Sequence, residues 1–182
     1  MKKVSLLLFS VLCVSVMYAQ KGKVAAAVNY EATNDLSAAK EAIDLALNDV
    51  KSNTWPKTYI VAAKVYASLD RAGKLEDGYE KAVDFYKKAI ELDAIGDEIG
   101  KGKNKFSKEI KLALTMCTND LTNAAIDNFN KEDFNGALFD FESILWANRF
   151  DNATYNEASD SVFIWNAALG AYNAKNWPKS EL

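Results

Sequence analysis

The sequence of 182 residues contains no histidine, only two prolines and only two cysteines. Without histidine, the chain lacks the commonest general base, the commonest metal ligand and the usual pH-sensitive switch of proteins. A Ser-His-Asp triad is therefore excluded, and so are zinc sites, which need clusters of cysteine and histidine. The 25 acidic residues are expected on polar helix faces, where they are solvated. We predict a protein with no enzymatic activity, no cofactor and no metal site.

Two short stretches approach known ligand-binding motifs but fail on residue type or spacing. In the segment 128–139, Asp133 stands where a calcium-binding loop needs glycine, and Phe139 stands where it needs glutamate. The run Gly100-Lys101-Gly102-Lys103 lacks the spacing and the following Ser or Thr of a phosphate-binding loop. Neither stretch changes the prediction of a non-enzymatic protein.

The first 19 residues have the pattern of a secretory signal peptide. Lys2 and Lys3 precede an almost wholly apolar run over residues 4–16, and the small Ala19 follows. The run is shorter than the about 20 apolar residues that span a bilayer. We expect cleavage after Ala19, which places the mature chain, 20–182, in the periplasm or outside the cell. No later apolar run reaches spanning length, so no membrane span is expected after cleavage.

The mature chain is mildly acidic and has a single cysteine. Loss of two of the 22 basic residues leaves 20 of them against 25 acidic residues, a net charge of about −5. Dispersed charge of this sign disfavours binding to nucleic acid. Cys117 has no partner for an internal disulfide, and its place in the apolar run 112–117 predicts a buried side chain.

Apolar residues recur at spacings of three and four along the mature chain, while strict alternation is rare, and this pattern predicts an all-α fold. Four segments also share one order: a polar turn, a large apolar residue, two spacers and a small residue. The small residues are Ala39, Ala82, Ala137 and Ser180, separated by 43, 55 and 43 residues. A period of this length is typical of helix-turn-helix repeats.

Apolar stripes flank each of these turns and predict the two helices of a pair. The predicted second helices carry Ala39, Ala42, Ile43, Ala46, Leu47 and Val50; Ala82, Val83, Tyr86, Ala89, Ile90 and Leu92; and Ala137, Leu138, Phe141, Ile144 and Leu145. The predicted first helices carry Ala27 with Tyr30, Ala63 with Tyr66, Ala125 with Phe129, and Ala168 with Tyr172. Small alanines allow two antiparallel helices to approach closely.

The segment Tyr79–Asp93 resembles the tetratricopeptide repeat family, because Ala82 and Ala89 lie seven residues apart with Tyr86 between them. The resemblance covers most of residues 21–182 and implies antiparallel helix pairs stacked as an α-solenoid, in an exported protein of a Gram-negative bacterium. The chain departs from the family in its longer period, in the missing closing proline and in Ile144, which replaces the second alanine of the third repeat.

We expect one repeat domain over 20–182, with about three and a half helix pairs and a C-terminal end that is truncated or covered by a partner. Loops are predicted at 94–105 and 149–157. Residues 106–130 are expected to form one long helix, or two helices that break near Thr118. Asp160-Ser161-Val162 resembles a short O-glycosylation motif of some Gram-negative bacteria; the alternative is that Asp160 or Ser161 caps a helix.

The family resemblance implies a partner-binding groove lined by the first helix of each pair. The residues that it places there are Lys57, Ile60 and Lys64 in the second repeat; Asn119, Thr122, Ile126 and Asn130 in the third; and Trp165, Leu169 and Asn173 in the fourth. Trp165 is the foremost candidate, because tryptophan is enriched where binding energy concentrates; the alternative is that it packs on the neighbouring repeat.

We predict a non-enzymatic adaptor or scaffold of the cell envelope that holds a protein or peptide segment in this groove. A different class of function is also open: a glycan- or surface-associated binding component of a nutrient-uptake system. Four tryptophans, Trp55, Trp146, Trp165 and Trp177, motivate this alternative. The sequence leaves the oligomeric state open.

Overall fold

The computed structural model of the chain describes residues 22–96, 103–150 and 157–180. The predicted signal peptide lies outside the described residues, as do residues 97–102 and 151–156 of the two predicted loops. The described residues form helices and turns and contain no strand, which confirms the all-α prediction. In chain order the elements are a helix over residues 22–32, α2 (Leu36–Leu47), the short 3-10 helix η1 (Ser52–Thr54), α3 (Pro56–Arg71), α4 (Gly78–Ile95), α5 (Ser107–Asn130), α6 (Phe134–Phe150), α7 (Glu157–Asn173) and α8 (Trp177–Ser180).

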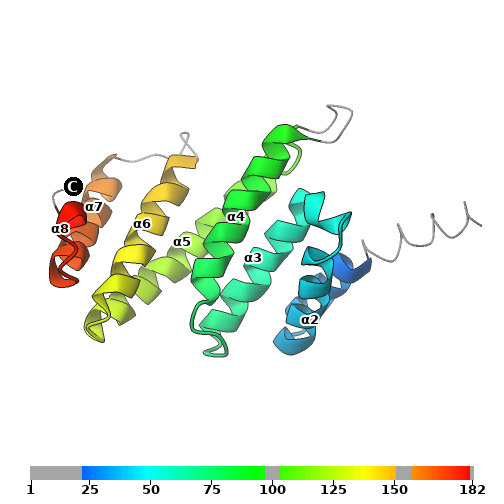
Figure 1. Cartoon of the computed structure of the whole chain (residues 1–182), viewed down its shortest axis with the longest axis horizontal. Coiled ribbons are helices and arrows are strands. Elements are labelled where there is room, and N and C mark those ends of the chain that lie inside the picture. The colour runs from blue at the N-terminus through cyan, green and yellow to red at the C-terminus, as the bar shows by residue number, and fades with distance from the viewer. Residues whose placement is uncertain (1–21, 97–102, 151–156, 181–182) are drawn as a thin grey trace, which may run out of the picture. The chain divides into compact units, whose positions relative to one another are not determined.

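The helices belong to two compact units, residues 1–106 and 107–182. In the first unit α3 packs on α4 and on α2; in the second, α6 packs on both α5 and α7, and α8 packs on α7 (Figure 1). The prediction of one continuous repeat domain stays a prediction. None of the described helices combines the length and apolar character that crossing a membrane requires.

One turn geometry occurs four times among the residues that the structure describes. In each turn, a residue in the left-handed conformation donates its N–H to the carbonyl three residues back, and the next residue donates to the carbonyl five residues back. This pair of hydrogen bonds is the Schellman motif, which satisfies the last carbonyls of a helix. The left-handed residues are Asn34, Gly73, Glu132 and Lys175, with φ of 61°, 64°, 63° and 58°.

These turns lie where the repeated sequence pattern predicts them in three of the four cases. Asn34, Glu132 and Lys175 each precede the small residue of their repeat by five positions. In the second repeat the left-handed residue is Gly73, nine positions before Ala82. Six residues, 72–77, separate α3 from α4, against three in each of the other turns, and Gly78 stands at the start of α4 rather than in the helix-ending turn.

The core of the first unit forms between α3, α2 and the helix over residues 22–32. Its buried side chains include Val24, Ala27, Leu36, Ala39, Ile43, Ala46, Val61, Ala62, Val65, Tyr66 and Leu69. The predicted stripe of α2 is correct up to Leu47 and wrong at Val50, which is 81% exposed. The reason is that α2 ends at Leu47 and Asn48 caps it, so Val50 lies in the turn before η1.

In the second unit, amide–carboxylate hydrogen bonds join consecutive helices. Asn128 of α5 donates to Asp140 of α6 at 2.9 Å, and Asn148 of α6 donates to Asp160 of α7, also at 2.9 Å. Both carboxylates are buried, so these bonds offset part of the cost of removing the charges from water. Asp160 therefore has a role in helix packing.

Several boundaries differ from the sequence-based expectation. Residues 107–130 form one uninterrupted helix, α5, which decides between the two alternatives for this segment. The helices α4 and α6 end at Ile95 and Phe150, so each extends into its predicted loop by two residues. Because α7 begins at Glu157, Asp160 and Ser161 lie within the helix, and the prediction that one of them caps it is wrong.

Candidate functional site

A cluster of three titratable side chains links α2 to α3. The hydroxyl of Tyr66 donates to Oδ1 of Asp44 at 2.7 Å, and Nζ of Lys40 lies 2.6 Å from Oδ2 of the same carboxylate. Lys40 and Asp44 are one helical turn apart on α2, the spacing at which side chains of opposite charge meet. The Lys40 ammonium also lies 5.2 Å from the centre of the Tyr66 ring.

The pKa shifts in this cluster indicate a structural role. Burial, followed by the hydrogen bond to Asp44, raises the pKa of Tyr66. The hydrogen bond to Asp44 raises the pKa of Lys40. Near neutral pH, therefore, Tyr66 keeps its proton, Lys40 keeps its charge, and both oxygens of Asp44 already accept a donor. Neither Tyr66 nor Lys40 is therefore poised to take a proton from a substrate.

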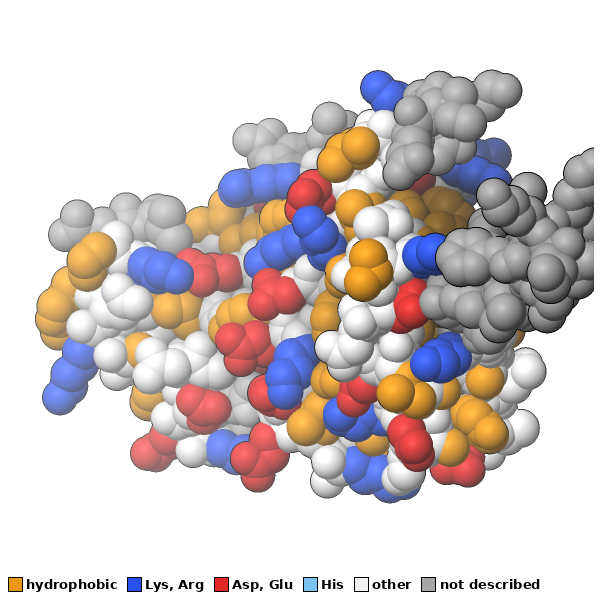
Figure 2. Space-filling model, turned by 45° about the vertical axis from the view of Figure 1, so that its right-hand side comes forward, with side chains coloured by type: hydrophobic (Ala, Val, Ile, Leu, Met, Phe, Trp, Pro, Cys, Tyr) orange, Lys and Arg blue, Asp and Glu red, His pale blue; other side chains and the backbone are white. Residues whose placement is uncertain are grey.

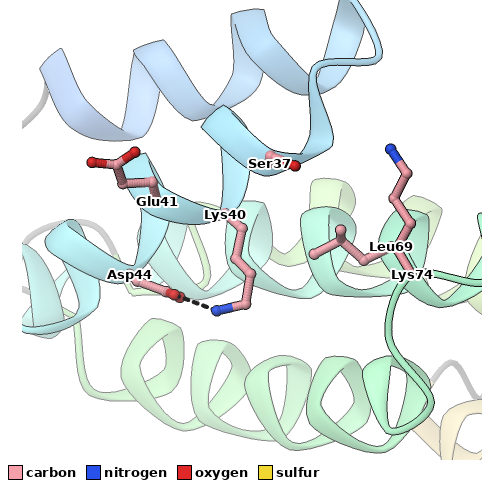
Figure 3. Close-up of a pocket in the computed structure, with 6 residues that line it drawn as sticks. All are labelled: Ser37, Lys40, Glu41, Asp44, Leu69 and Lys74. Atoms are coloured by element: carbon pink, nitrogen blue, oxygen red, sulfur yellow. Dashed lines mark hydrogen bonds and ion pairs between the residues drawn. The ribbon is translucent and has the colours of Figure 1, made fainter.

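The same cluster borders an open pocket with a volume of about 440 Å³, lined by Ser37, Lys40, Glu41, Asp44, Leu69 and Lys74 (Figure 3). The lining has two lysines and two carboxylates, and the dashed contact in Figure 3 shows one lysine and one carboxylate paired with each other. The sequence-based reasoning missed this pocket; the one available signal was the four-residue spacing of Lys40 and Asp44. Within the described ranges, no group of three or more cysteine, aspartate or glutamate side chains is placed to hold a metal ion.

Of the predicted groove residues in the first unit, one is inaccessible. The side chains of Lys57 and Lys64 on α3 are partly exposed, whereas Ile60 has 0% exposure. A partner cannot contact Ile60 without displacing its neighbours, so the expectation that it lines a groove is wrong. The cause is that α3 is covered on most of its sides over this stretch, where Ile60, Val61, Ala62 and Ala63 are buried in succession.

The predicted groove residues on α5 are more accessible. Asn119, Ile126 and Asn130 are exposed, and Thr122 is partly exposed. The hydroxyl of Thr122 donates to the carbonyl of Thr118 at 2.7 Å, which leaves it less available to a partner. These residues share one side of α5, opposite the side that buries Ile110, Cys117 and Leu121. The burial of Cys117 confirms its prediction as a core side chain.

The predicted groove residues on α7 fall on a single exposed face. Trp165 is 70% exposed, which argues against the alternative that it packs on a neighbouring repeat. Leu169 and Asn173 follow it at spacings of four residues, and the Asn173 amide donates to the carbonyl of Leu169 at 3.0 Å. The structure therefore shows Trp165 on an accessible face, and its role in binding stays a prediction.

Further exposed apolar side chains extend this face of α7 into a continuous surface. Spacings of three, four and three residues separate Val162, Trp165, Leu169 and Tyr172, and all four are exposed. The ring of Trp177 on α8, also exposed, contacts the ring of Tyr172 edge-on, with 5.4 Å between centroids. We call these five residues the α7 stripe. The segment 161–174, which contains four of them, has no charged residue.

Charged side chains are distributed differently on α4 in the first unit. There Lys81 pairs with Asp77, Lys87 with Asp84 and Lys88 with Glu91, at distances of 2.6, 3.4 and 2.8 Å. Figure 2 shows basic and acidic side chains interspersed over the face that it presents. Alternating charges of this kind are typical of a solvated surface.

The four tryptophans do not form one set. Trp55 is half-buried and lies edge-on to Phe106, with 6.4 Å between ring centroids. Trp146 is also half-buried. Only Trp165 and Trp177 expose more than half of their surface, so two of the four rings that motivated a glycan-binding surface are largely covered.

No family model, curated protein or solved structure matches this chain.

Proposed function

We propose that this chain is a non-enzymatic binding protein of the cell envelope, built of helix pairs like those of tetratricopeptide repeats, and that it docks a protein on the α7 stripe. The single observation that carries the proposal is the stripe itself: four exposed apolar side chains on α7, whose segment 161–174 has no charge, together with the exposed Trp177 on α8. Exposed contiguous apolar surface on a water-soluble fold marks an interaction site. The repeated Schellman turns support the comparison with helix-pair repeats.

The chemistry of the stripe favours protein over carbohydrate as the ligand. The centres of protein interfaces are enriched in tryptophan and tyrosine and depleted of charged residues, and the stripe has both features. A sugar would also need polar side chains directed at its hydroxyls, whereas the Asn173 amide beside the stripe already donates to Leu169. Glycan binding that is lost in Trp165→Ala would reverse this preference.

Site-specific photo-crosslinking in living cells tests the proposal. A photoreactive amino acid replaces Trp165, and a second variant carries it at Val50, which is 81% exposed but lies outside the stripe. We expect a crosslinked protein from position 165 and none from position 50. The crosslinked partner is identified by mass spectrometry, and its binding is repeated with purified proteins. Equal crosslinking from both positions, or none from position 165, contradicts the proposal.

The predicted location is tested separately by cell fractionation. Export with removal of residues 1–19 predicts that the chain appears in the periplasmic or extracellular fraction with Gln20 as its first residue. N-terminal sequencing of the purified protein measures this directly. A chain that retains Met1 and remains in the cytoplasm contradicts the location while leaving the binding surface untouched.

A further inference from the structure

From Asp160 to Asn173, where the burial of α7 is described, the exposed residues are arranged symmetrically about position 167. Trp165 and Leu169 lie two residues to either side of it, and Val162 and Tyr172 lie five residues to either side. In both pairs, one side chain is large and aromatic and the other is a smaller aliphatic one. Ser161 and Asn173, six residues from the same centre, are both exposed and polar.

This symmetry matters when two copies of α7 lie antiparallel across a two-fold axis. The axis reverses the residue order, so each residue faces the one equally distant on the other side of the centre. Trp165 then faces Leu169 of the second copy, and Val162 faces Tyr172. A large side chain therefore meets a small one in both facing pairs, which lets the two helices interdigitate without voids or overlap. The spacings of three and four are also those of helices that pack along a seam.

The lack of charge over residues 161–174 suits contact between identical surfaces. A two-fold interface brings a surface patch against itself, so a charged residue near the axis faces its own sign. Charged residues make up 26% of the whole chain, yet the segment 161–174 has none. The patch can therefore be covered by its own copy without burying an unpaired charge.

The exposed area of the α7 stripe is also large enough to form the apolar part of an interface between two copies. Aromatic side chains bury about 150 to 250 Å² each when covered, so the three partly covered rings and two aliphatic side chains offer on the order of 500 Å². A standard interface buries about 800 Å² on each partner. The α7 stripe supplies the apolar part of such an interface, and polar neighbours such as Ser161 and Asn173 supply its rim.

We propose that two copies of this chain associate through their α7 stripes as a two-fold, antiparallel helix pair in which Trp165 of each copy packs on Leu169 of the other. The inference rests on the proposed function, because it names the protein that docks on the stripe. It also accounts for the stripe without any other partner.

Sedimentation equilibrium tests the association, with protein purified from cells that express the full chain. We expect a mass that rises with concentration from one chain to two. Trp165→Ala should raise the dissociation constant by about 30-fold or more, as for a central interface tryptophan. The control Val50→Ala should leave it unchanged. A mass of one chain at every concentration, or equal association of Trp165→Ala and wild type, overturns the proposal.

Exchanging the two central residues tests the antiparallel register. Trp165→Leu alone places leucine against leucine, and Leu169→Trp alone places tryptophan against tryptophan, so each single variant should weaken association. The double variant W165L/L169W restores one large and one small residue in each layer and should recover it. The proposal is overturned if the double variant associates no more strongly than either single variant does. Unchanged circular dichroism and thermal unfolding show that each variant is folded.

The crosslinking variant at position 165 separates this inference from the proposed function. Crosslinked peptides that come from two copies of this chain support both. Crosslinking to a different protein, together with a mass of one chain in sedimentation, overturns the inference and leaves the proposed function standing. The absence of any crosslink from position 165 contradicts both.

Discussion

The hydroxyl of Tyr66 on α3 donates a 2.7 Å hydrogen bond to Asp44 on α2, while Lys40 contacts the other oxygen of the same carboxylate. Tyr66→Phe removes the donating hydroxyl and leaves a partly buried carboxylate oxygen of Asp44 without a hydrogen-bond donor. We expect the free energy of unfolding to fall by about 1.5 to 3 kcal/mol, the usual range for a hydrogen bond to a charged group. Urea unfolding measures the change. Tyr30→Phe is the matched control, because Tyr30 is an exposed tyrosine of the same unit, and an equal loss in both variants would contradict the role of the bond.

The same cluster predicts lower stability at alkaline pH. Burial and the Asp44 hydrogen bond raise the pKa of Tyr66 above its ordinary value of 10.0, so the folded protein holds this proton more tightly than the unfolded one. The stabilisation is complete below about pH 10 and is lost as the pH rises through the folded pKa. The raised pKa of Lys40 acts in the same direction.

Urea unfolding on both sides of pH 10 measures this loss. Between these two pH values, wild type should lose more free energy of unfolding than Tyr66→Phe. In that variant, Lys40 is the only residue of the cluster whose raised pKa still contributes to the loss. Identical losses in the two proteins would show that Tyr66 titrates alike in the folded and unfolded states.

At the start of α4, Gly78 fits where no other residue can. A Cβ at this position would lie 2.5 Å from the backbone oxygen of Tyr66 and 2.6 Å from Cβ of Asp70. Gly78→Ala must therefore push α4 away from α3, and we expect a loss of about 2 to 3 kcal/mol. Gly22→Ala is the control, because nothing lies within 4 Å of its added Cβ. Thermal unfolding distinguishes the two, and a Gly78→Ala variant as stable as the control would contradict the close approach.

In the turn between α5 and α6, Glu132 adopts φ of 63°, a conformation that costs a residue with a side chain about 1 kcal/mol relative to glycine. Glu132→Gly should therefore raise the free energy of unfolding by about 0.5 to 1 kcal/mol. Glu132→Ala removes the same charge but keeps a Cβ, so it should give no such gain. If both variants gain equally in urea unfolding, the charge of Glu132 and not its conformation is the cause.

The sequence was sufficient to predict the all-α class and the positions of most turns, because both depend on local patterns. Spacings of three and four located the helices, and the polar turns before Ala39, Ala137 and Ser180 were placed correctly. The second turn was misplaced because Gly78 looks like a turn glycine, whereas the close contact with Tyr66 is what requires it. That contact joins residues twelve positions apart, and no local pattern reports it.

The candidate site was predictable only in part, for the same reason. Trp165, Leu169 and Asn173 were expected on an accessible face and lie on one. The burial of Ile60 was missed because it depends on which face of α3 the rest of the fold covers. The pocket beside Lys40 was missed because its lining comes from the polar side of α2 together with residues at the end of α3 and in the turn after it.

The four Schellman turns also have a consequence for how the chain folds. Each turn is closed by hydrogen bonds that span at most five residues, and within each unit the helices pack chiefly on their neighbours in sequence. Native contacts of such short range lose little loop entropy when they form, so they favour rapid folding. Each hairpin can assemble while the chain is still being synthesised, before the helices that follow it exist.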